Sequence, residues 1–116
     1  MLNKVFYTNW FIPSRFTAYT IGFVVLVRPS AKGDEGMLQH ELTHVKQFWH
    51  NPVGPIFSMF NRKLRQKYEV EAYKVQMSYP PYKDEYDRYL SVFSAVLSTK
   101  YNLGITFNEA KKLLSE

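Results

Sequence analysis

Residues 34–50 of the chain read DEGMLQHELTHVKQFWH, and this stretch predicts a helix with two chemically different faces. Asp34 is a suitable N-cap. The helix ends at Asn51-Pro52, because the residue before a proline avoids the α region. Apolar residues recur at helical spacing and predict one face packed on a core: Leu38, Leu42, Val45 and Trp49. His40 and His44 lie off this stripe, on a face left free for chemistry.

Segments 3–8 and 18–28, before this helix, are predicted strands. The second is rich in β-branched and aromatic residues and stops at Pro29. Gly22 inside it indicates a bulge or a close backbone approach.

Three further helices are expected after the first. They run from about Pro55 or Asn61 to Ser78, from about Lys83 to Lys100, and from Thr106 to about Leu114. Thr106 and Glu109 have the spacing of a capping box. The whole predicts one α+β domain over residues 1–116, with a small N-terminal sheet followed by three to four packed helices.

Composition narrows the function classes. The chain has 116 residues, 46% of them hydrophobic, which suits one globular domain. It has no cysteine, so any metal ligands must be His, Asp or Glu. The first residues do not resemble a signal peptide, and the longest apolar run, 21–27, is too short to span a bilayer. A cytoplasmic protein without a membrane span is expected.

The net charge of +5 would attract nucleic acid, anionic lipid or acidic cell-wall polymers. The densest basic stretch is Arg62, Lys63, Arg65 and Lys67. No nucleic-acid-binding motif accompanies it, so a solvated helix start is favoured, and a basic nucleic-acid-binding domain is kept as an alternative. The oligomeric state is left open.

Residues 40–44 read His-Glu-Leu-Thr-His and carry the predicted chemistry. On a helix, residues four apart differ by only about 40° around the axis, so both imidazoles point the same way. His40 and His44 are therefore expected to bind one zinc ion. Glu41, beside the first ligand, is placed to act as general base on a zinc-bound water.

A third ligand is sought on the following helix, in Tyr68-Glu-Val-Glu-Ala-Tyr. Glu69 and Glu71 are turned about 200° from each other, so only one of them can face the metal. Ala72 is small enough to allow close approach of the two helices. Glu69 is favoured, with Tyr73 beside it to orient a ligand.

His50 is the other candidate, because it follows His44 by six residues, as the last histidine does in HExxHxxGxxH. That motif needs a glycine three residues after the second histidine, where this chain has Gln47. If the helix continues to residue 50, His50 lies about 240° around the axis from His44 and faces away.

The HELTH motif together with Glu69-Val-Glu-Ala72-Tyr73 resembles the gluzincins, the thermolysin-like class of zinc peptidases. It is also similar to short, uncharacterised phage and bacterial proteins of metallopeptidase type. The resemblance covers about residues 19–76. It implies a minimal gluzincin-like fold, with His40, His44 and Glu69 as zinc ligands and Glu41 as base.

The chain departs from this class at two points. Tyr73 stands where small gluzincin-like families commonly have Asp or Asn, which would orient a ligand histidine. Two roles are left open for Tyr73: its hydroxyl would do this less directly, or the ring would simply pack. No further histidine is present to stabilise an oxyanion, so Tyr79 and Arg88, with Tyr82 and Tyr86, are considered as substitutes. A packed tyrosine or a surface arginine is nevertheless the favoured explanation of each.

The expected function is zinc-dependent hydrolysis of a peptide or protein, endopeptidase-like, with the strand around Gly22–Val27 holding an extended substrate by strand addition. The alternative is a catalytically inactive, zinc-stabilised binding or structural module.

Overall fold

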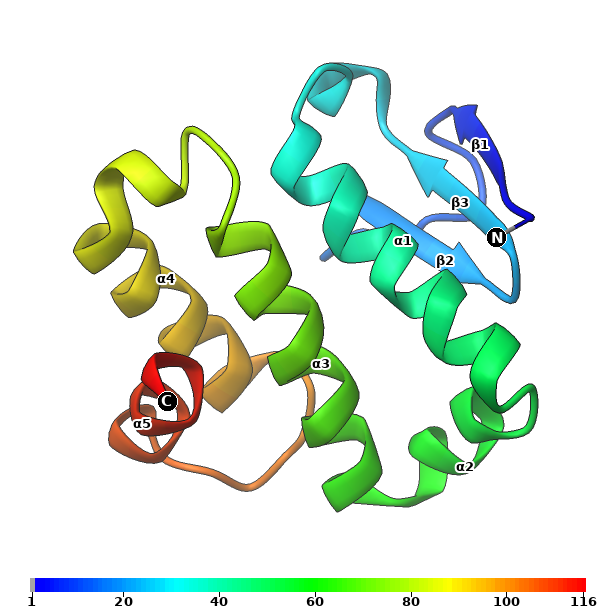
Figure 1. Cartoon of the computed structure of the whole chain (residues 1–116). Coiled ribbons are helices and arrows are strands. Elements are labelled where there is room, and N and C mark those ends of the chain that lie inside the picture. The colour runs from blue at the N-terminus through cyan, green and yellow to red at the C-terminus, as the bar shows by residue number, and fades with distance from the viewer. Residues whose placement is uncertain (1) are drawn as a thin grey trace.

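A three-stranded sheet precedes five α-helices along the chain (Figure 1). The structure is a computed structural model, and it describes residues 2–116. The strands are β1 (Lys4–Tyr7), β2 (Ala18–Ile21) and β3 (Val24–Val27), in the order β1-β3-β2. β1 runs parallel to β3, and β2 runs antiparallel to it. The predicted α+β class is confirmed.

The predicted single strand at 18–28 is wrong, because the chain reverses at Gly22 and Phe23 to make the hairpin of β2 and β3. Gly22 has φ +61°, which glycine adopts without the steric cost of a side chain. A two-residue loop of this kind suits the twist of a hairpin. The expectation that Gly22–Val27 receives a substrate strand is also wrong, because β3 is paired on both sides and only β1 and β2 have a free edge.

Helix α1 (Glu35–His50) lies across one face of the sheet, with the bounds and cap that the sequence predicts. The Asp34 side chain accepts a hydrogen bond from the Met37 backbone N–H, so it is the N-cap. Within the apolar stripe, Val45 is buried, whereas Trp49 at the far end is 39% exposed.

Two helices, not one, occupy the segment predicted from Pro55 or Asn61 to Ser78. They are α2 (Gly54–Phe60) and α3 (Arg62–Met77). They separate at Asn61, whose extended backbone breaks the helix and whose side chain caps α3 by accepting from the Leu64 N–H. This break explains why the structure has five helices where three to four were expected.

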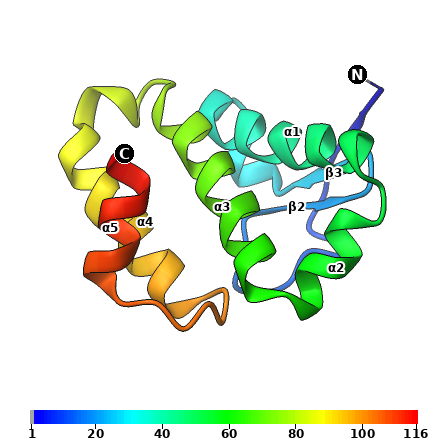
Figure 2. The same ribbon diagram turned by 60° about the horizontal axis from the view of Figure 1, so that its bottom comes forward.

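The chain ends in two helices that pack on the side of α3 away from the sheet (Figure 2). A short 3-10 turn (Lys83–Glu85) leads into α4 (Tyr86–Thr99), and α5 (Phe107–Ser115) follows. The capping box of Thr106 and Glu109 is confirmed in both of its hydrogen bonds.

Apolar side chains gather in two separate clusters. One lies between the sheet and α1 and contains Ala18, Val25, Val27 and Val45. The other joins α3, α4 and α5 and contains Tyr73, Met77, Tyr82, Leu90, Phe93, Leu97, Leu103, Ala110 and Leu114. The seam between them, where α1 meets α3, buries polar side chains: His40, Glu41, Gln47 and Gln76. Buried polar groups are costly unless they are partnered, so this seam is where a function is expected.

None of the helices described for residues 2–116 is long and apolar enough to cross a membrane.

Candidate metal centre

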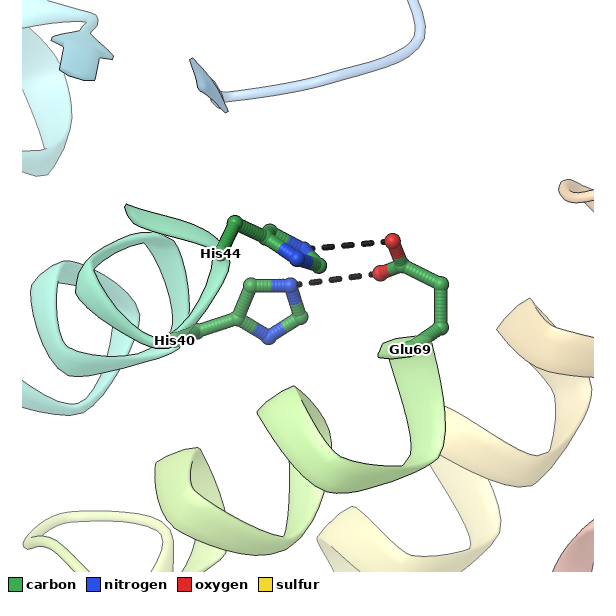
Figure 3. Close-up of side chains that lie close together, drawn as sticks. All are labelled: His40, His44 and Glu69. Carbon is green, nitrogen blue, oxygen red and sulfur yellow. Dashed lines mark ion pairs between the residues drawn. The ribbon is translucent and has the colours of Figure 1, made fainter. Parts of the chain in front are cut away.

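His40, His44 and Glu69 converge in the seam between α1 and α3 (Figure 3). The Nε2 atom of His40 lies 3.4 Å from Oε1 of Glu69, and Nε2 of His44 lies 3.1 Å from Oε2. One ligand atom from each of the three residues falls within 4.8 Å of the others. The side chains are largely enclosed, with 5%, 17% and 14% exposed, respectively.

Small residues let α1 and α3 come close enough for this convergence. Ala72 on α3 is fully buried. Gly36 on α1 is also required, since a Cβ there would lie 2.6 Å from the Tyr82 ring and 2.9 Å from the Gln76 carbonyl oxygen. Both contacts are shorter than real side chains tolerate, so a larger residue at position 36 would push the helices apart.

Gln47 fixes the orientation and the tautomer of His44. The Gln47 side-chain amide donates to the Tyr68 carbonyl at 3.1 Å, so its Oε1 is left to accept from His44 Nδ1 at 2.8 Å. The Nδ1 atom of His44 must therefore carry a proton, and the lone pair of the neutral ring lies on Nε2, which faces Glu69. Zinc-binding histidines in proteins are held in this way by an acceptor on their other nitrogen.

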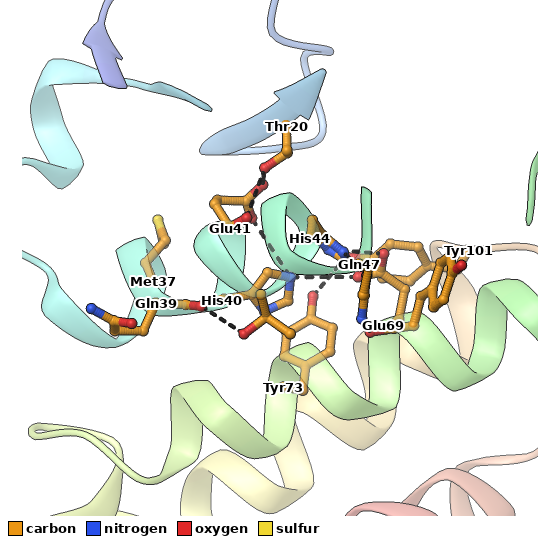
Figure 4. Close-up of polar contacts among 12 residues, drawn as sticks. Thr20, Met37, Gln39, His40, Glu41, His44, Gln47, Glu69, Tyr73 and Tyr101 are labelled. Carbon is orange, nitrogen blue, oxygen red and sulfur yellow. Dashed lines mark hydrogen bonds and ion pairs between the residues drawn. The ribbon is translucent and has the colours of Figure 1, made fainter. Parts of the chain in front are cut away.

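Glu41 lies beside the cluster with its two oxygens in different surroundings (Figure 4). Thr20 on β2 donates to Oε1 at 2.8 Å, which anchors the carboxylate. The other oxygen, Oε2, lies 3.6 Å from His40 Nε2 and faces the cluster. The sheet thus positions one residue of α1 for work at the α1–α3 seam.

The pKa values of His44 and Glu69 depend on each other. Burial lowers the pKa of His44, but the charge and hydrogen bond of Glu69 outweigh burial and raise this pKa to about 10. Burial raises the pKa of the Glu69 carboxyl, but the charge of His44, together with the nearby His40, outweighs burial and holds this pKa well below its usual range. Without a metal, the pair is therefore an imidazolium beside a carboxylate.

The donor set fits a zinc ion. Two imidazole nitrogens and one carboxylate oxygen are the ligands of a catalytic zinc site that keeps its fourth position open. Glu69 Oε1 is buried and accepts no hydrogen bond from the described residues, so a cation between it and the histidines would satisfy it. His40 Nδ1 is likewise buried without a hydrogen-bond partner in this part of the chain, and His40 is thus held less firmly than His44.

Tyr73 is close to the cluster, and of its two expected roles the structure shows packing, because its hydroxyl does not bond to a ligand residue. Its ring packs edge-on against His40, with centroids 4.4 Å apart. Its hydroxyl shares a 2.8 Å hydrogen bond with the hydroxyl of Tyr101, from the loop between α4 and α5. Burial, followed by the nearby charge of Glu69, raises the pKa of both tyrosines, which therefore stay protonated.

The other candidates lie outside the cluster. Glu71 is exposed on the opposite side of α3, and His50 is exposed at the last residue of α1. Arg88 pairs with Glu85 on the surface at 3.2 Å. Tyr79 lies beyond the end of α3, roughly 15 Å along the axis from Glu69.

Tyr82 and Tyr86 are also placed away from the histidines. The Tyr82 hydroxyl donates to Asp34 at the start of α1. Tyr86 begins α4 and is 40% exposed. The structure therefore brings none of the four oxyanion candidates to the cluster.

Sequence reasoning missed three residues that shape this site: Thr20, Gln47 and Tyr101. The sequence gives a partial signal for Gln47, since it lies three residues after His44 and hence on a neighbouring part of the helix surface. Thr20 and Tyr101 carry no local signal, because both reach the site only through the fold, 21 and 32 residues from Glu41 and Glu69.

No family model, curated protein or solved structure matches this chain.

Proposed function

We propose that the chain is a zinc-dependent hydrolase of peptide bonds. The observation that carries the proposal is the pairing of a two-histidine, one-glutamate cluster with a separate carboxylate oxygen, Glu41 Oε2, 3.6 Å from His40 Nε2. A site that only stored or sensed a metal would have no need of this fourth, unbound acid.

His40, His44 and Glu69 would hold the ion. When bound, zinc supplies a Lewis acid that polarises a carbonyl and lowers the pKa of water in its open position. Glu41 accepts the proton of the attacking water at Oε2 and delivers it to the leaving amine. Thr20 keeps Oε1 occupied, so the carboxylate presents one oxygen in a fixed direction.

The free edge of β2 is the place where we expect an extended substrate to pair. The hydrogen bond from the Arg28 N–H to the Thr17 carbonyl sets the alternation along the hairpin. By that alternation, Tyr19 bonds to β3, whereas the backbone groups of Ala18 and Thr20 point away from it. The residue that anchors Glu41 thus also offers a backbone N–H and C=O to a peptide strand.

A zinc-stabilised, catalytically inactive module is the second candidate, and one observation favours it. The cluster is nearly enclosed, and two cavities of the described chain lie away from it, one beside the start of α1 and one between α3 and α5. An ion there would join the two halves of the molecule even if no substrate reached it.

Glu41→Gln separates the two candidates. The amide keeps the size of the side chain but cannot take a proton. We expect the variant to bind zinc as the wild type does and to lose cleavage of a mixed peptide library by at least about a hundredfold. The peptidase proposal fails if the zinc-loaded wild type cleaves no peptide, or if the variant cleaves equally well.

A further inference from the structure

Helix α2 has the reverse of the polarity expected for a surface helix. Its inward residues are small: Gly54 is buried against the Tyr68 hydroxyl, and Ser58 is half-buried. Its large apolar side chains point to solvent. We define the α2 face as these residues with their exposed fractions: Val53 53%, Ile56 61%, Phe57 61%, Met59 69% and Phe60 84%. A contiguous apolar surface of this kind marks a contact with another apolar phase.

Aromatic residues extend this surface toward the hairpin. Trp49, at the end of α1, stacks on Phe23 of the hairpin turn with ring centroids 6.1 Å apart, and both rings are more than one-third exposed. Ile21 beside the turn is 54% exposed. The hairpin turn and α2 lie on the same side of the molecule in both views (Figures 1 and 2).

The exposed charged side chains of the segment that carries the α2 face are all positive. Residues 42–68 contain no Asp or Glu. The exposed cations there are Lys46, Arg62, Lys63 and Lys67. Arg65 is not among them, because its guanidinium donates to backbone carbonyls on α2 and on the loop after α4. The segment that carries the protruding apolar groups therefore adds exposed positive charges and no negative ones.

We propose that the α2 face docks the protein on an anionic lipid bilayer. Phe57, Phe60 and Met59 would enter the boundary between headgroups and acyl chains, while the flanking lysines and arginines contact lipid phosphates. Trp49 would lie at the headgroup level, where amphipathic rings are favoured.

Other occupants fit this surface less well. A second copy of the chain, related by a two-fold axis, would bring two basic borders together, and like charges repel. Nucleic acid would satisfy the cations but would leave the exposed Ile, Phe and Met without a partner. A bilayer with anionic headgroups complements both the charge and the apolar surface.

The test is flotation of the full-length protein with vesicles of phosphatidylcholine alone, or of phosphatidylcholine mixed with phosphatidylglycerol. We expect binding to the anionic vesicles that weakens as salt is raised. Phe57→Ser with Phe60→Ser should weaken it by about tenfold or more. Lys63→Glu with Lys67→Glu should do the same. These side chains are exposed, so the melting temperature should stay near that of the wild type.

Matched controls on the far side of the molecule distinguish binding through the α2 face from non-specific adsorption to vesicles. Val92→Ser with Phe107→Ser, and Lys111→Glu with Lys112→Glu, change exposed residues of α4 and α5 and should leave vesicle binding unchanged. Glu41→Gln should also bind normally, because docking does not depend on hydrolysis.

Three results would overturn the proposal. The first is that neither kind of vesicle is bound. The second is that the two phenylalanine substitutions leave vesicle binding intact, or that the control variants reduce it equally. The third is that the phenylalanine substitutions abolish a dimer in solution, or that duplex DNA competes fully for the same face. The first result would identify a second copy of the chain as the partner of the α2 face, and the second would identify nucleic acid.

Discussion

Thr20 determines which oxygen of Glu41 is free, although it belongs to the sheet and carries no chemistry itself. Its hydroxyl bonds to Oε1 at 2.8 Å and also to the Glu41 backbone carbonyl at 3.2 Å. Removing the hydroxyl should let the carboxylate turn while leaving the zinc-binding cluster unchanged.

Thr20→Val keeps the shape of the side chain and tests this positioning. We expect kcat to fall by roughly tenfold with zinc affinity unchanged, because a base that is free to rotate spends less time in the productive direction. Thr20→Ser, which keeps the hydroxyl, should restore the rate. An unaltered kcat in the valine variant would show that Glu41 is held by something else.

His44 provides a pH signature of metal binding. Its pKa is raised to about 10 in the metal-free protein, so at pH 8 both ring nitrogens carry protons. Zinc must displace the proton on Nε2, because Nδ1 remains bonded to Gln47. About one proton should therefore be released from His44 per zinc bound at pH 8, and affinity should rise with pH until about pH 10.

Calorimetry at pH 8 in two buffers of different ionisation enthalpy measures that proton directly. The observed binding enthalpies should differ by the difference in buffer ionisation multiplied by the number of protons released. Equal enthalpies in the two buffers would mean that zinc does not replace a proton on His44.

At the scale of elements, Arg65 joins three parts of the chain. Its guanidinium donates to the carbonyls of Ser58 and Met59 on α2, and to Tyr101 and Asn102 after α4, at 2.8–3.1 Å. It thereby fixes α2, α3 and the loop that carries Tyr101.

Arg65→Ala should lower the free energy of unfolding by about 2 kcal/mol, because four carbonyls lose a charged donor and two of the bonds are partly buried. Urea denaturation gives this value. The matched control is Lys63→Ala, an exposed change in the same helix, for which a loss within about 0.5 kcal/mol is expected. A similar loss in both variants would show that Arg65 contributes no more to the free energy of unfolding than an exposed lysine does.

The elements that sequence alone predicted well are those with strong local signals. Asp34, Asn51-Pro52 and the Thr106–Glu109 capping box fix the ends of α1 and the start of α5 through contacts within a few residues. The hairpin was missed because β-branched and aromatic residues predominate on both sides of Gly22, so the reversal is revealed by the positive φ of that glycine. At Asn61 the sequence left two starts open for a single helix, Pro55 or Asn61, and it did not predict that residues 54–60 form a separate helix, α2.

The residues of the site can be separated in the same way, into those that local patterns predict and those that depend on the fold. His40, Glu41 and His44 follow from spacing on one helix, and Glu69 was favoured from its position on the next helix. Thr20 and Tyr101 depend on the packing of segments far apart in the chain, and no local pattern encodes that packing. Their part in the site becomes visible only when β2, α3 and the loop after α4 are placed together.

At the scale of the whole molecule, the candidate metal centre lies between two apolar clusters that do not merge. α1 packs with the sheet and α3 packs with α4 and α5, so their seam depends on the His–Glu cluster and on the close contacts at Gly36 and Ala72. A metal ligated from both helices would bind the folded state alone and hold its two halves together.

Zinc should therefore raise the thermal stability of the protein. With free zinc at about a hundred times its dissociation constant, linkage gives about 2.7 kcal/mol, which corresponds to a rise in melting temperature on the order of 10 °C for a chain of this size. Circular dichroism melts with zinc, with EDTA and with magnesium measure it. A melting temperature that is the same in zinc and in EDTA would contradict a metal that joins α1 and α3.

The zinc content of purified variants shows which side chains hold the ion. We predict one zinc ion per chain in the wild type, in His50→Ala and in Glu71→Ala, because both of these side chains are exposed and lie outside the cluster. We predict that Glu69→Ala and His44→Ala lose the ion. Zinc retained in full by Glu69→Ala, or lost from His50→Ala alone, would contradict the ligand set on which this account of the protein rests.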